Sequence, residues 1–95
     1  MKYAYPAILY PDEGQVGVRV PDLPGCFTFG ENKAEALLMA KDAIEMWLLS
    51  AEDKRWNIPA PSESLDIEDG EIMTWVAADT DEWRDQVGEG DATRL

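Results

Sequence analysis

The side chains that could do chemistry gather around residues 20–32, VPDLPGCFTFGEN, which contain the only cysteine of the chain, Cys26. A cysteine acts as a nucleophile when a neighbouring base, often histidine, takes its proton. The chain has no histidine, so a Cys–His pair within it is excluded, and one cysteine alone is also a poor zinc site. We therefore predict that Cys26 is a small buried side chain at the start of a strand, preceded by a turn.

Four turn carboxylates, Asp12, Glu13, Asp22 and Glu31, are the second candidates, because they could hold Mg²⁺ if they met at one edge of the fold. Their spacing does not match a dedicated metal loop such as the twelve-residue calcium motif. No glycine-rich phosphate loop is present either. We expect solvated turn acids, with no metal, no cofactor and no catalytic residue.

The charge of the chain restricts its partners. Twenty acids and eight bases give a net charge of −12 over 95 residues, and residues 62–95 alone hold eleven acids and two bases, a local charge of −9. Such a chain repels nucleic-acid phosphates, since affinity for them depends on Lys and Arg. It attracts basic proteins. We expect no direct nucleic-acid binding. The acids either attract a basic protein partner or simply keep the protein soluble, and the charge alone does not decide between the two.

Aromatic side chains could in principle form a platform on which RNA bases stack. Tyr3, Tyr5, Phe27 and Phe29 are the candidates. Platforms of this kind need basic surroundings, which this sequence lacks. We therefore predict that these aromatics pack in the core.

The hydrophobic pattern predicts one small α+β domain. Alternation of apolar and polar residues predicts strands at residues 3–10, 15–20, 26–29 and 71–78. A turn over residues 11–14 makes the first two strands a hairpin, and the sequence Leu23-Pro24-Gly25-Cys26 fits a type II turn. Pro6 lacks an N–H, so either regular pairing begins after it or that side of the backbone is unpaired.

A helix is predicted from the capping residue Asn32 to about Asp53 or Lys54, with Glu35 reaching back to the backbone of Asn32. Trp56 and Ile58 are expected to attach the long aperiodic segment that follows to the body. The apolar stripe recurs at spacings of three and four and comprises Ala36, Leu37, Ala40, Ile44, Trp47, Leu48 and Ala51.

The element order is therefore β-β-β-α-β. We expect a three-stranded antiparallel sheet, one helix on one face, and a fourth strand parallel to the first after a right-handed crossover. Leu38, Met39, Met46 and Leu49 lie off the centre of the helical stripe, which favours either self-association or packing under the long loop. Residues 80–95 are expected to be an acidic tail or a short helix.

Residues 5–48 resemble the N-terminal domain of HicB-family antitoxins. The resemblance rests on Tyr5-Pro6-Ala7, the acidic turn at residues 11–14, the sequence Pro21-Asp22-Leu23-Pro24-Gly25-Cys26, and Glu35-Ala36 through Ala40. The sequence Ile58-Pro59-Ala60-Pro61-Ser62 is similar to the loop before the last strand of that family. The match covers about three-quarters of the chain.

The resemblance implies a partial ribonuclease-H-like fold in a HicB-like domain at residues 1–79. It also implies that the chain binds and neutralises a small basic HicA-type toxin that cleaves messenger RNA. Many family members continue into a DNA-binding domain, and no such domain is evident in residues 80–95. The expected toxin contacts are the acids Asp12, Glu13, Asp22, Asp79, Asp81, Glu82 and Asp85.

Two other functions stay open from the sequence. One is an oligomeric binding module without a toxin, and the other is a weak metal-dependent ribonuclease-H-like nuclease using Asp22 or Glu31. No apolar run is long enough for a membrane span and no signal peptide is recognisable. We therefore expect a cytoplasmic protein. From the candidate residues and the helical surface described above, we also expect it to be non-enzymatic and to form a homodimer or a higher oligomer.

Overall fold

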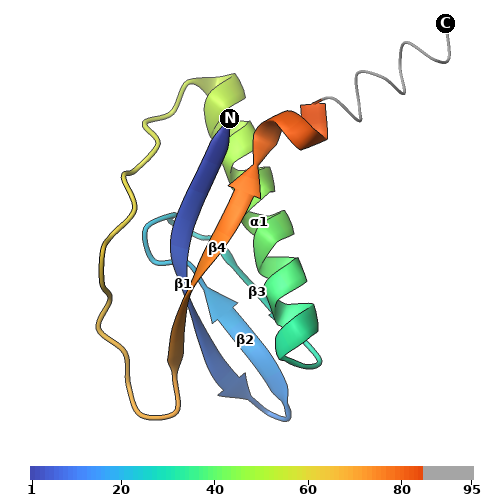
Figure 1. Ribbon diagram of the computed structural model, residues 1–95, viewed down its shortest axis with the longest axis vertical. Coiled ribbons are helices and arrows are strands. Elements are labelled where there is room, and N and C mark those ends of the chain that lie inside the picture. Colours follow the sequence, from blue (N-terminus) through green and yellow to red (C-terminus); the bar gives the residue numbers. More distant parts are fainter. Residues whose placement is uncertain (85–95) are drawn as a thin grey trace, which may run out of the picture.

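A computed structural model describes residues 1–84 as one α+β unit, in which a single helix lies on one face of a four-stranded sheet (Figure 1). The strand order across the sheet is β3-β2-β1-β4. The elements are β1 (Lys2–Asp12), β2 (Gln15–Arg19), β3 (Phe27–Gly30), α1 (Lys33–Lys54) and β4 (Ile72–Asp79). The predicted order β-β-β-α-β is confirmed.

Glycines with positive φ form the two turns of the N-terminal half. β1 and β2 pair antiparallel from Ile8↔Arg19 to Asp12↔Gln15, so that a two-residue turn of Glu13 (φ 50°) and Gly14 (φ 86°) closes the hairpin. Positive φ at both positions is the type I′ geometry that suits the twist of a hairpin. In the second turn Gly25 has φ 79°, and the Cys26 N–H donates to the Leu23 carbonyl at 3.0 Å, as a type II turn requires.

The fourth strand runs antiparallel to the first, so the predicted parallel arrangement is wrong. The pairing runs from Lys2↔Asp79 to Leu9↔Ile72. The reason is the segment of residues 55–71, which returns from the C-terminal end of α1 to the opposite end of the sheet, on the side of β1 away from the helix, before β4 begins (Figure 1). The parallel prediction assumed that the helix alone makes the crossover, whereas helix and return segment together bring the chain into the sheet from the opposite end.

Pro6 lies inside β1 because its nitrogen faces a side of the strand that has no partner. The Thr80 N–H donates to the Met1 carbonyl at 3.1 Å, so odd-numbered residues of β1 present their backbone groups to β4. The nitrogen of Pro6 therefore faces the β2 side, where pairing begins only at Ile8↔Arg19. Of the two alternatives drawn from the sequence, the unpaired backbone is the one observed.

The core lies between the inward face of the sheet and the predicted stripe of α1. Tyr5, Ala7 and Leu9 of β1 and Val18 of β2 are buried against the helix. The helix contributes Ala36, Ala40, Ile44, Leu48 and Ala51, all fully buried. Leu37, predicted for the stripe, is 39% exposed. The alanines let the helix axis approach the strands closely.

The helix begins and ends where the capping residues predict. The Asn32 side chain accepts the Glu35 N–H at 2.9 Å, and Arg55 (φ 58°) closes the C-terminus in the left-handed conformation. The Glu35 carboxylate accepts the N–H of Glu31 at 3.0 Å rather than that of Asn32, so the predicted capping box is shifted by one residue. Both bonds satisfy backbone N–H groups at the helix entry.

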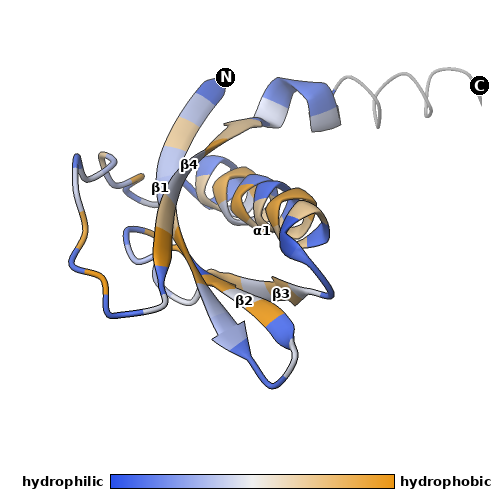
Figure 2. Ribbon diagram, turned by 60° about the horizontal axis from the view of Figure 1, so that its bottom comes forward, coloured by the Kyte–Doolittle hydropathy of each residue, from blue (hydrophilic) through white to orange (hydrophobic). Residues whose placement is uncertain are grey.

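The outer face of the sheet has no helix over it within residues 1–84 (Figure 2). This face exposes two aromatics that were predicted for the core. Phe27 and Phe29 are 72% and 57% exposed. Strand alternation directs Cys26 inward and therefore Phe27 outward. The core prediction is right for Tyr5, which is buried, and wrong for these two phenylalanines.

The first part of the long segment after α1 is attached to the body through Trp56, Ile58 and Pro59. The Trp56 ring packs edge-on against Trp47 with 5.8 Å between ring centroids, and Ile58 contacts the core, as predicted. The Tyr5 hydroxyl donates to the Pro59 carbonyl at 2.5 Å. Leu38 and Met46 of α1 remain 67% and 52% exposed, so packing under this segment does not account for them.

We predict that Gly30→Ala destabilises the fold by about 1–3 kcal/mol, because the new methyl group overpacks the contact between β3 and α1. A Cβ at Gly30 would lie 2.4 Å from the Ala36 nitrogen and 2.7 Å from its Cα, which are backbone atoms. Urea unfolding measures the change. Gly17→Ala is the matched control, since its Cβ meets only the Tyr10 ring, which can rotate away. Equal losses in both variants would contradict the prediction.

Candidate functional site

The predicted contact acids lie at opposite ends of the molecule rather than on one surface. Asp12 and Glu13 form the tip of the β1–β2 hairpin, whereas Asp79 ends β4 and is followed by a helical turn over residues 80–84 (Figure 1). This turn agrees with the short helix expected after the last strand. Asp85 lies outside the described residues.

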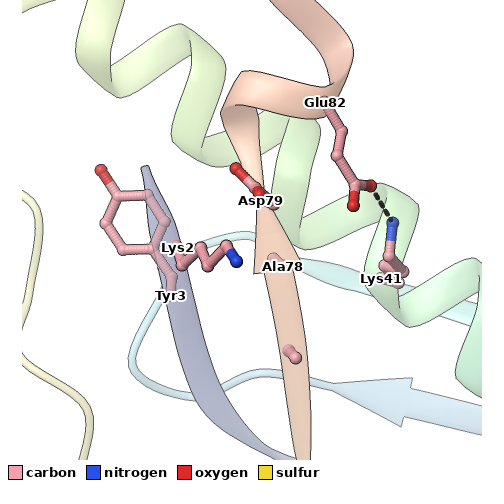
Figure 3. Close-up of a pocket in the computed structure, with 7 residues that line it drawn as sticks. Lys2, Tyr3, Lys41, Ala78, Asp79 and Glu82 are labelled. Atoms are coloured by element: carbon pink, nitrogen blue, oxygen red, sulfur yellow. Dashed lines mark hydrogen bonds and ion pairs between the residues drawn. The ribbon is translucent and has the colours of Figure 1, made fainter.

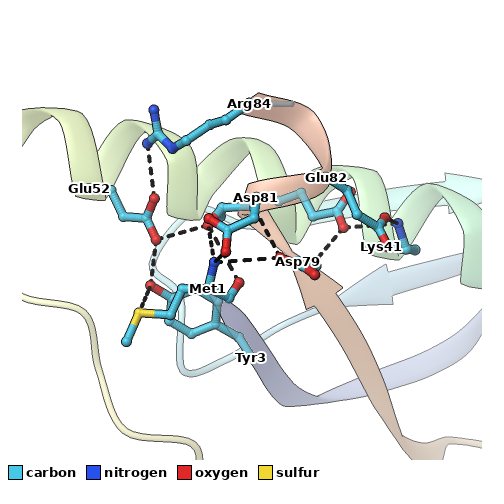
Figure 4. A network of polar contacts seen from close by, with 10 residues as sticks. Met1, Tyr3, Lys41, Glu52, Asp79, Asp81, Glu82 and Arg84 are labelled. Atoms are coloured by element: carbon cyan, nitrogen blue, oxygen red, sulfur yellow. Dashed lines mark hydrogen bonds and ion pairs between the residues drawn. The ribbon is translucent and has the colours of Figure 1, made fainter. Parts of the chain in front are cut away.

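The acids at the β4 end belong to a polar network that joins β1, α1 and residues 80–84 (Figure 4). Its centre is Glu52 of α1, whose carboxylate accepts the Tyr3 hydroxyl at 2.6 Å and the Thr80 hydroxyl at 3.0 Å. Arg84 donates to the same carboxylate at 2.9 Å and to Asp53 at 3.0 Å. These bonds hold the turn of residues 80–84 against the helix.

The network changes the pKa values of its central groups. Burial, reinforced by the hydrogen bond to Glu52, raises the pKa of Tyr3 to about 12. Burial opposes ionisation of Glu52, but the hydrogen bonds from Tyr3, Arg84 and Thr80 outweigh it, and the pKa of Glu52 is lowered. Glu52 is therefore the anionic partner on which this end of the fold depends.

A second carboxylate, Glu45 of α1, is almost fully buried at 1% exposure. One of its oxygens accepts the Lys41 ammonium at 2.9 Å and the backbone N–H of Asp79 at 2.9 Å. Lys41 also reaches Glu82 at 3.5 Å, in the wall of a shallow hollow of about 220 Å³ (Figure 3). The buried charge is thus paired, as its position demands, and it connects the helix to the end of β4.

The acids of this end already have cationic partners within the chain. Glu82 is paired with Lys41, and the side chains of Asp79 and Asp81 both contact the amino group of Met1. Part of their charge is therefore neutralised internally. They remain 17% to 67% exposed, so a partner can still reach Asp81 and Glu82.

Asp22 has a structural contact that the sequence did not reveal. Its carboxylate accepts both the backbone N–H of Ser62 at 2.8 Å and the Ser62 hydroxyl at 2.6 Å. Asp22 lies between β2 and β3. It binds Ser62 of the long segment, which is forty residues further along the sequence. Neither residue belongs to a periodic element, so no local pattern could have joined them.

The hairpin end carries acids of a different kind, which we name the hairpin-end acidic surface: Asp12, Glu13, Glu68 and Asp69. All four are exposed, and none takes part in the salt bridges found among residues 1–84. A hollow of about 210 Å³ lies between the hairpin and the end of the long segment, with Pro11, Gln15 and Gly70 in its walls. Figures 1 and 2 both show the two stretches at the same end of the molecule.

Glu68 and Asp69 were not among the expected contact residues, although the acidic run of residues 66–71, DIEDGE, was a visible signal. They were missed because the path of the long segment was unknown. The tertiary structure brings this run to the hairpin end of the sheet, where Pro11 and Gln15 of the hairpin and Gly70 of the run line one hollow.

Cys26 is buried, as predicted, and burial raises its pKa to about 11. A thiol in this state is a weak nucleophile at neutral pH. Among residues 1–84, no three His, Cys, Asp or Glu side chains come together in an arrangement that could hold a metal ion. Over the same residues, no helix has the length and apolar character needed to cross a bilayer.

The sequence matches known proteins over most of its length. Residues 5–86 match the family model of the HicB-like antitoxin of bacterial toxin–antitoxin systems. A UPF0150 protein of Thermoplasma acidophilum is 45% identical over 56 residues, which are 58% of this chain and 81% of that protein. An uncharacterized 14.9 kDa protein of Haemophilus phage HP1 is 49% identical over 43 residues, which are 39% of this chain and only 32% of that protein.

Two solved structures share the fold. A toxin–antitoxin complex from Streptococcus pneumoniae contains a chain that matches with a TM-score of 0.75 at 21% identity, over 87% of this chain and 73% of that one. A HicA3 and HicB3 toxin–antitoxin complex contains a chain that matches with a TM-score of 0.66 at 22% identity, over 81% of this chain and 99% of that one. At these identities the matches establish the architecture.

We predict that the Glu52 network makes the fold acid-sensitive. Because the pKa of Glu52 is lowered in the folded state, its contribution to stability is present above the unfolded value, about 4.3, and is lost as pH falls through the folded value. The stability difference between the wild type and Glu52→Gln, from urea unfolding, should therefore be largest at pH 7 and should shrink below pH 4. Glu63→Gln, an exposed change, is the control. A difference that stays constant with pH would contradict the prediction.

We also predict that Cys26 resists thiol reagents in the folded protein. With a pKa of about 11, only about one thiol in a thousand is ionised at pH 8, and burial blocks access. Reaction with an aromatic disulfide reagent should be slow in buffer and fast in 8 M urea, and Cys26→Ser should remove it. Rapid stoichiometric reaction in buffer would show that the thiol is accessible.

Proposed function

The chain belongs to the family of HicB-like antitoxins of bacterial toxin–antitoxin systems, and from this premise we propose that it binds and neutralises a small basic toxin of the HicA type. The family match over residues 5–86 is the observation that carries the proposal. A toxin that cleaves messenger RNA must present a basic surface to its substrate. An acidic protein that covers this surface competes with the RNA.

We assign the first toxin contact to the hairpin-end acidic surface. Its four carboxylates are exposed and take part in none of the ion pairs among residues 1–84, so their charge is available to a partner, although Lys33 lines the hollow at this end. The type I′ turn holds Asp12 and Glu13 on a closed hairpin, which lowers the conformational entropy lost on binding. Such a surface accelerates the encounter with a basic partner.

The acids at the β4 end take a secondary part in this proposal. Asp81 and Glu82 are exposed, but their partners Met1 and Lys41 must be displaced before they can bind a toxin side chain in full. Asp79 is mostly covered, and Asp22 acts indirectly through its bonds to Ser62. Asp85 stays a predicted contact.

The proposed mechanism needs no catalysis by this chain. It works by steric and electrostatic occupation of the toxin, and it operates in the cytoplasm, where messenger RNA is translated. The low nucleophilicity of Cys26 supports a binding role.

The test is the association rate with the small basic protein encoded next to this chain. Asp12→Lys/Glu13→Lys should reduce the association rate constant about ten-fold at low salt and flatten its dependence on salt, because steering is electrostatic. Stopped-flow fluorescence or surface plasmon resonance at several NaCl concentrations provides the measurement. Asp42→Lys/Glu63→Lys makes the same charge change on other exposed parts of the surface and separates a local effect from the net charge.

Two results would overturn the proposal. One is the absence of any small basic protein in the neighbouring reading frame or of binding to it. The other is an equal loss of the association rate constant in both double variants, which would contradict the assignment of the hairpin-end acidic surface as the toxin contact. Circular dichroism and urea unfolding of each variant confirm that the fold is retained.

A further inference from the structure

The outer edge of β4 presents backbone groups that no strand of the described residues pairs. The register with β1 is unbroken from Lys2↔Asp79 to Leu9↔Ile72, so backbone groups alternate strictly between the two edges. The Thr80 N–H points to β1, where it donates to Met1, and the Asp79 N–H points the other way, to Glu45. The N–H and C=O groups of Met73, Trp75 and Ala77 therefore face outward.

This edge lacks the devices that usually protect an exposed strand. β4 is eight residues long, contains no proline, and has no charged residue before its last position, Asp79. Its regular register leaves no bulge. Monomeric proteins normally shorten, charge or cover such edges, because they pair readily with other chains. The opposite edge of the sheet is different, since β3 has only four residues.

Glu45 limits the length of the free edge. The Glu45 carboxylate accepts the Asp79 N–H and is paired with Lys41. The last of the outward-facing N–H groups of β4 therefore already has a partner within the chain. Between this N–H group and the acidic run that ends at Glu71, the open stretch is residues 73–77, MTWVA. This stretch is uncharged, and the side chain of its central residue, Trp75, is 45% exposed.

We infer that the β4 edge of a second copy of this chain pairs with it antiparallel, about a two-fold axis near Trp75 or Val76, to form one continuous eight-stranded sheet. An antiparallel strand that offers alternate N–H and C=O groups is complementary to a two-fold copy of itself. The homodimer expected from the sequence thus acquires a specific interface.

Charge favours a second copy over the basic toxin at this edge. Each chain has a net charge of −12, so two copies repel one another wherever acids meet. The stretch of residues 73–77 is neutral, so no acids meet within it. With the axis at Trp75, Glu71 of each copy lies opposite Asp79 of the other, and each of these acids has a cationic partner in its own chain, Arg19 for Glu71 and the Met1 amino group for Asp79. A basic toxin gains nothing electrostatically from a neutral strand, whereas the hairpin-end acidic surface lies before the start of β4, at the hairpin end of the sheet (Figure 1).

The test removes one outward N–H while leaving the β1–β4 ladder intact. Ala77→Pro deletes a donor that faces solvent in the monomer, a position at which edge strands tolerate proline, and Ala77→Thr keeps the donor as a matched control. Sedimentation velocity of the chain alone, without toxin, should show the wild type and Ala77→Thr at twice the 10.6 kDa chain mass. Ala77→Pro should dimerise about 10- to 100-fold more weakly, because the dimer loses two hydrogen bonds.

Hydrogen exchange measured residue by residue gives a second readout that does not depend on mass. The amides of Met73, Trp75 and Ala77 should be protected in the wild-type dimer, and those of Met73 and Trp75 should lose protection in the Ala77→Pro monomer. The amides of Thr74, Val76 and Ala78, which face β1, should stay protected in both. Trp75→Lys places two like charges near the axis and should give the same monomer by a different route.

Three results would overturn the inference. They are a monomer at every concentration, a dimer that Ala77→Pro leaves unchanged, and a dimer lost instead in Phe27→Ser/Phe29→Ser, which would indicate stacking of the exposed sheet faces. Because the toxin is absent from these experiments, their failure leaves the proposed toxin binding untouched.

Discussion

The structure depends on one packing constraint: a single helix can cover only one face of a four-stranded sheet. The helix lies so close to the inward face that β3 meets the α1 backbone with no room for a side chain at Gly30. The alanine-rich stripe of α1 and the inward residues of β1 and β2 close the core. Everything else in the molecule is arranged around the surfaces that this packing leaves open.

The outward sheet face and the β4 edge are the consequences of that constraint. The face shows Phe27, Phe29 and Trp75 to solvent, and the ion pair between Arg19 and Glu71 crosses it at 2.9 and 3.0 Å. By register this pair spans the central strand beside Ile8, which is 2% exposed. The pair thus joins β2 to the residue before β4 on the outer face of the sheet.

The acids of the chain divide into two groups with different physical roles. Those near the end of β4 are held by cations of the same chain, so they maintain the position of residues 80–84. Those at the hairpin end take part in no ion pair among residues 1–84, so their charge is available to a partner. The proposed toxin contact and the proposed self-pairing edge therefore differ in charge, one acidic and one neutral.

The amino-acid sequence by itself determined the local elements. The alternation of Val16 and Val18, the spacing of Ala36, Ala40 and Ile44, and the capping oxygen of Asn32 each act over a few residues, so strands, helix and turns were predicted nearly at their observed bounds. The motif of residues 21–26, together with the N-terminal Tyr5-Pro6-Ala7, the acidic turn and the helix that follows, indicated the family. Such patterns state which side of an element is apolar, because the side chains of a strand or helix repeat with its geometry.

Only the tertiary structure decided how these elements meet. The direction of β4 and the bond between Asp22 and Ser62 both depend on the path of residues 55–71, which has no periodicity to predict it. The division of the acids into paired and unpaired groups depends on contacts such as Lys41–Glu82, between residues far apart in the chain. Charge composition predicts the sign of the partner's charge. The position of each charge on the surface is set by long-range contacts that no local pattern encodes.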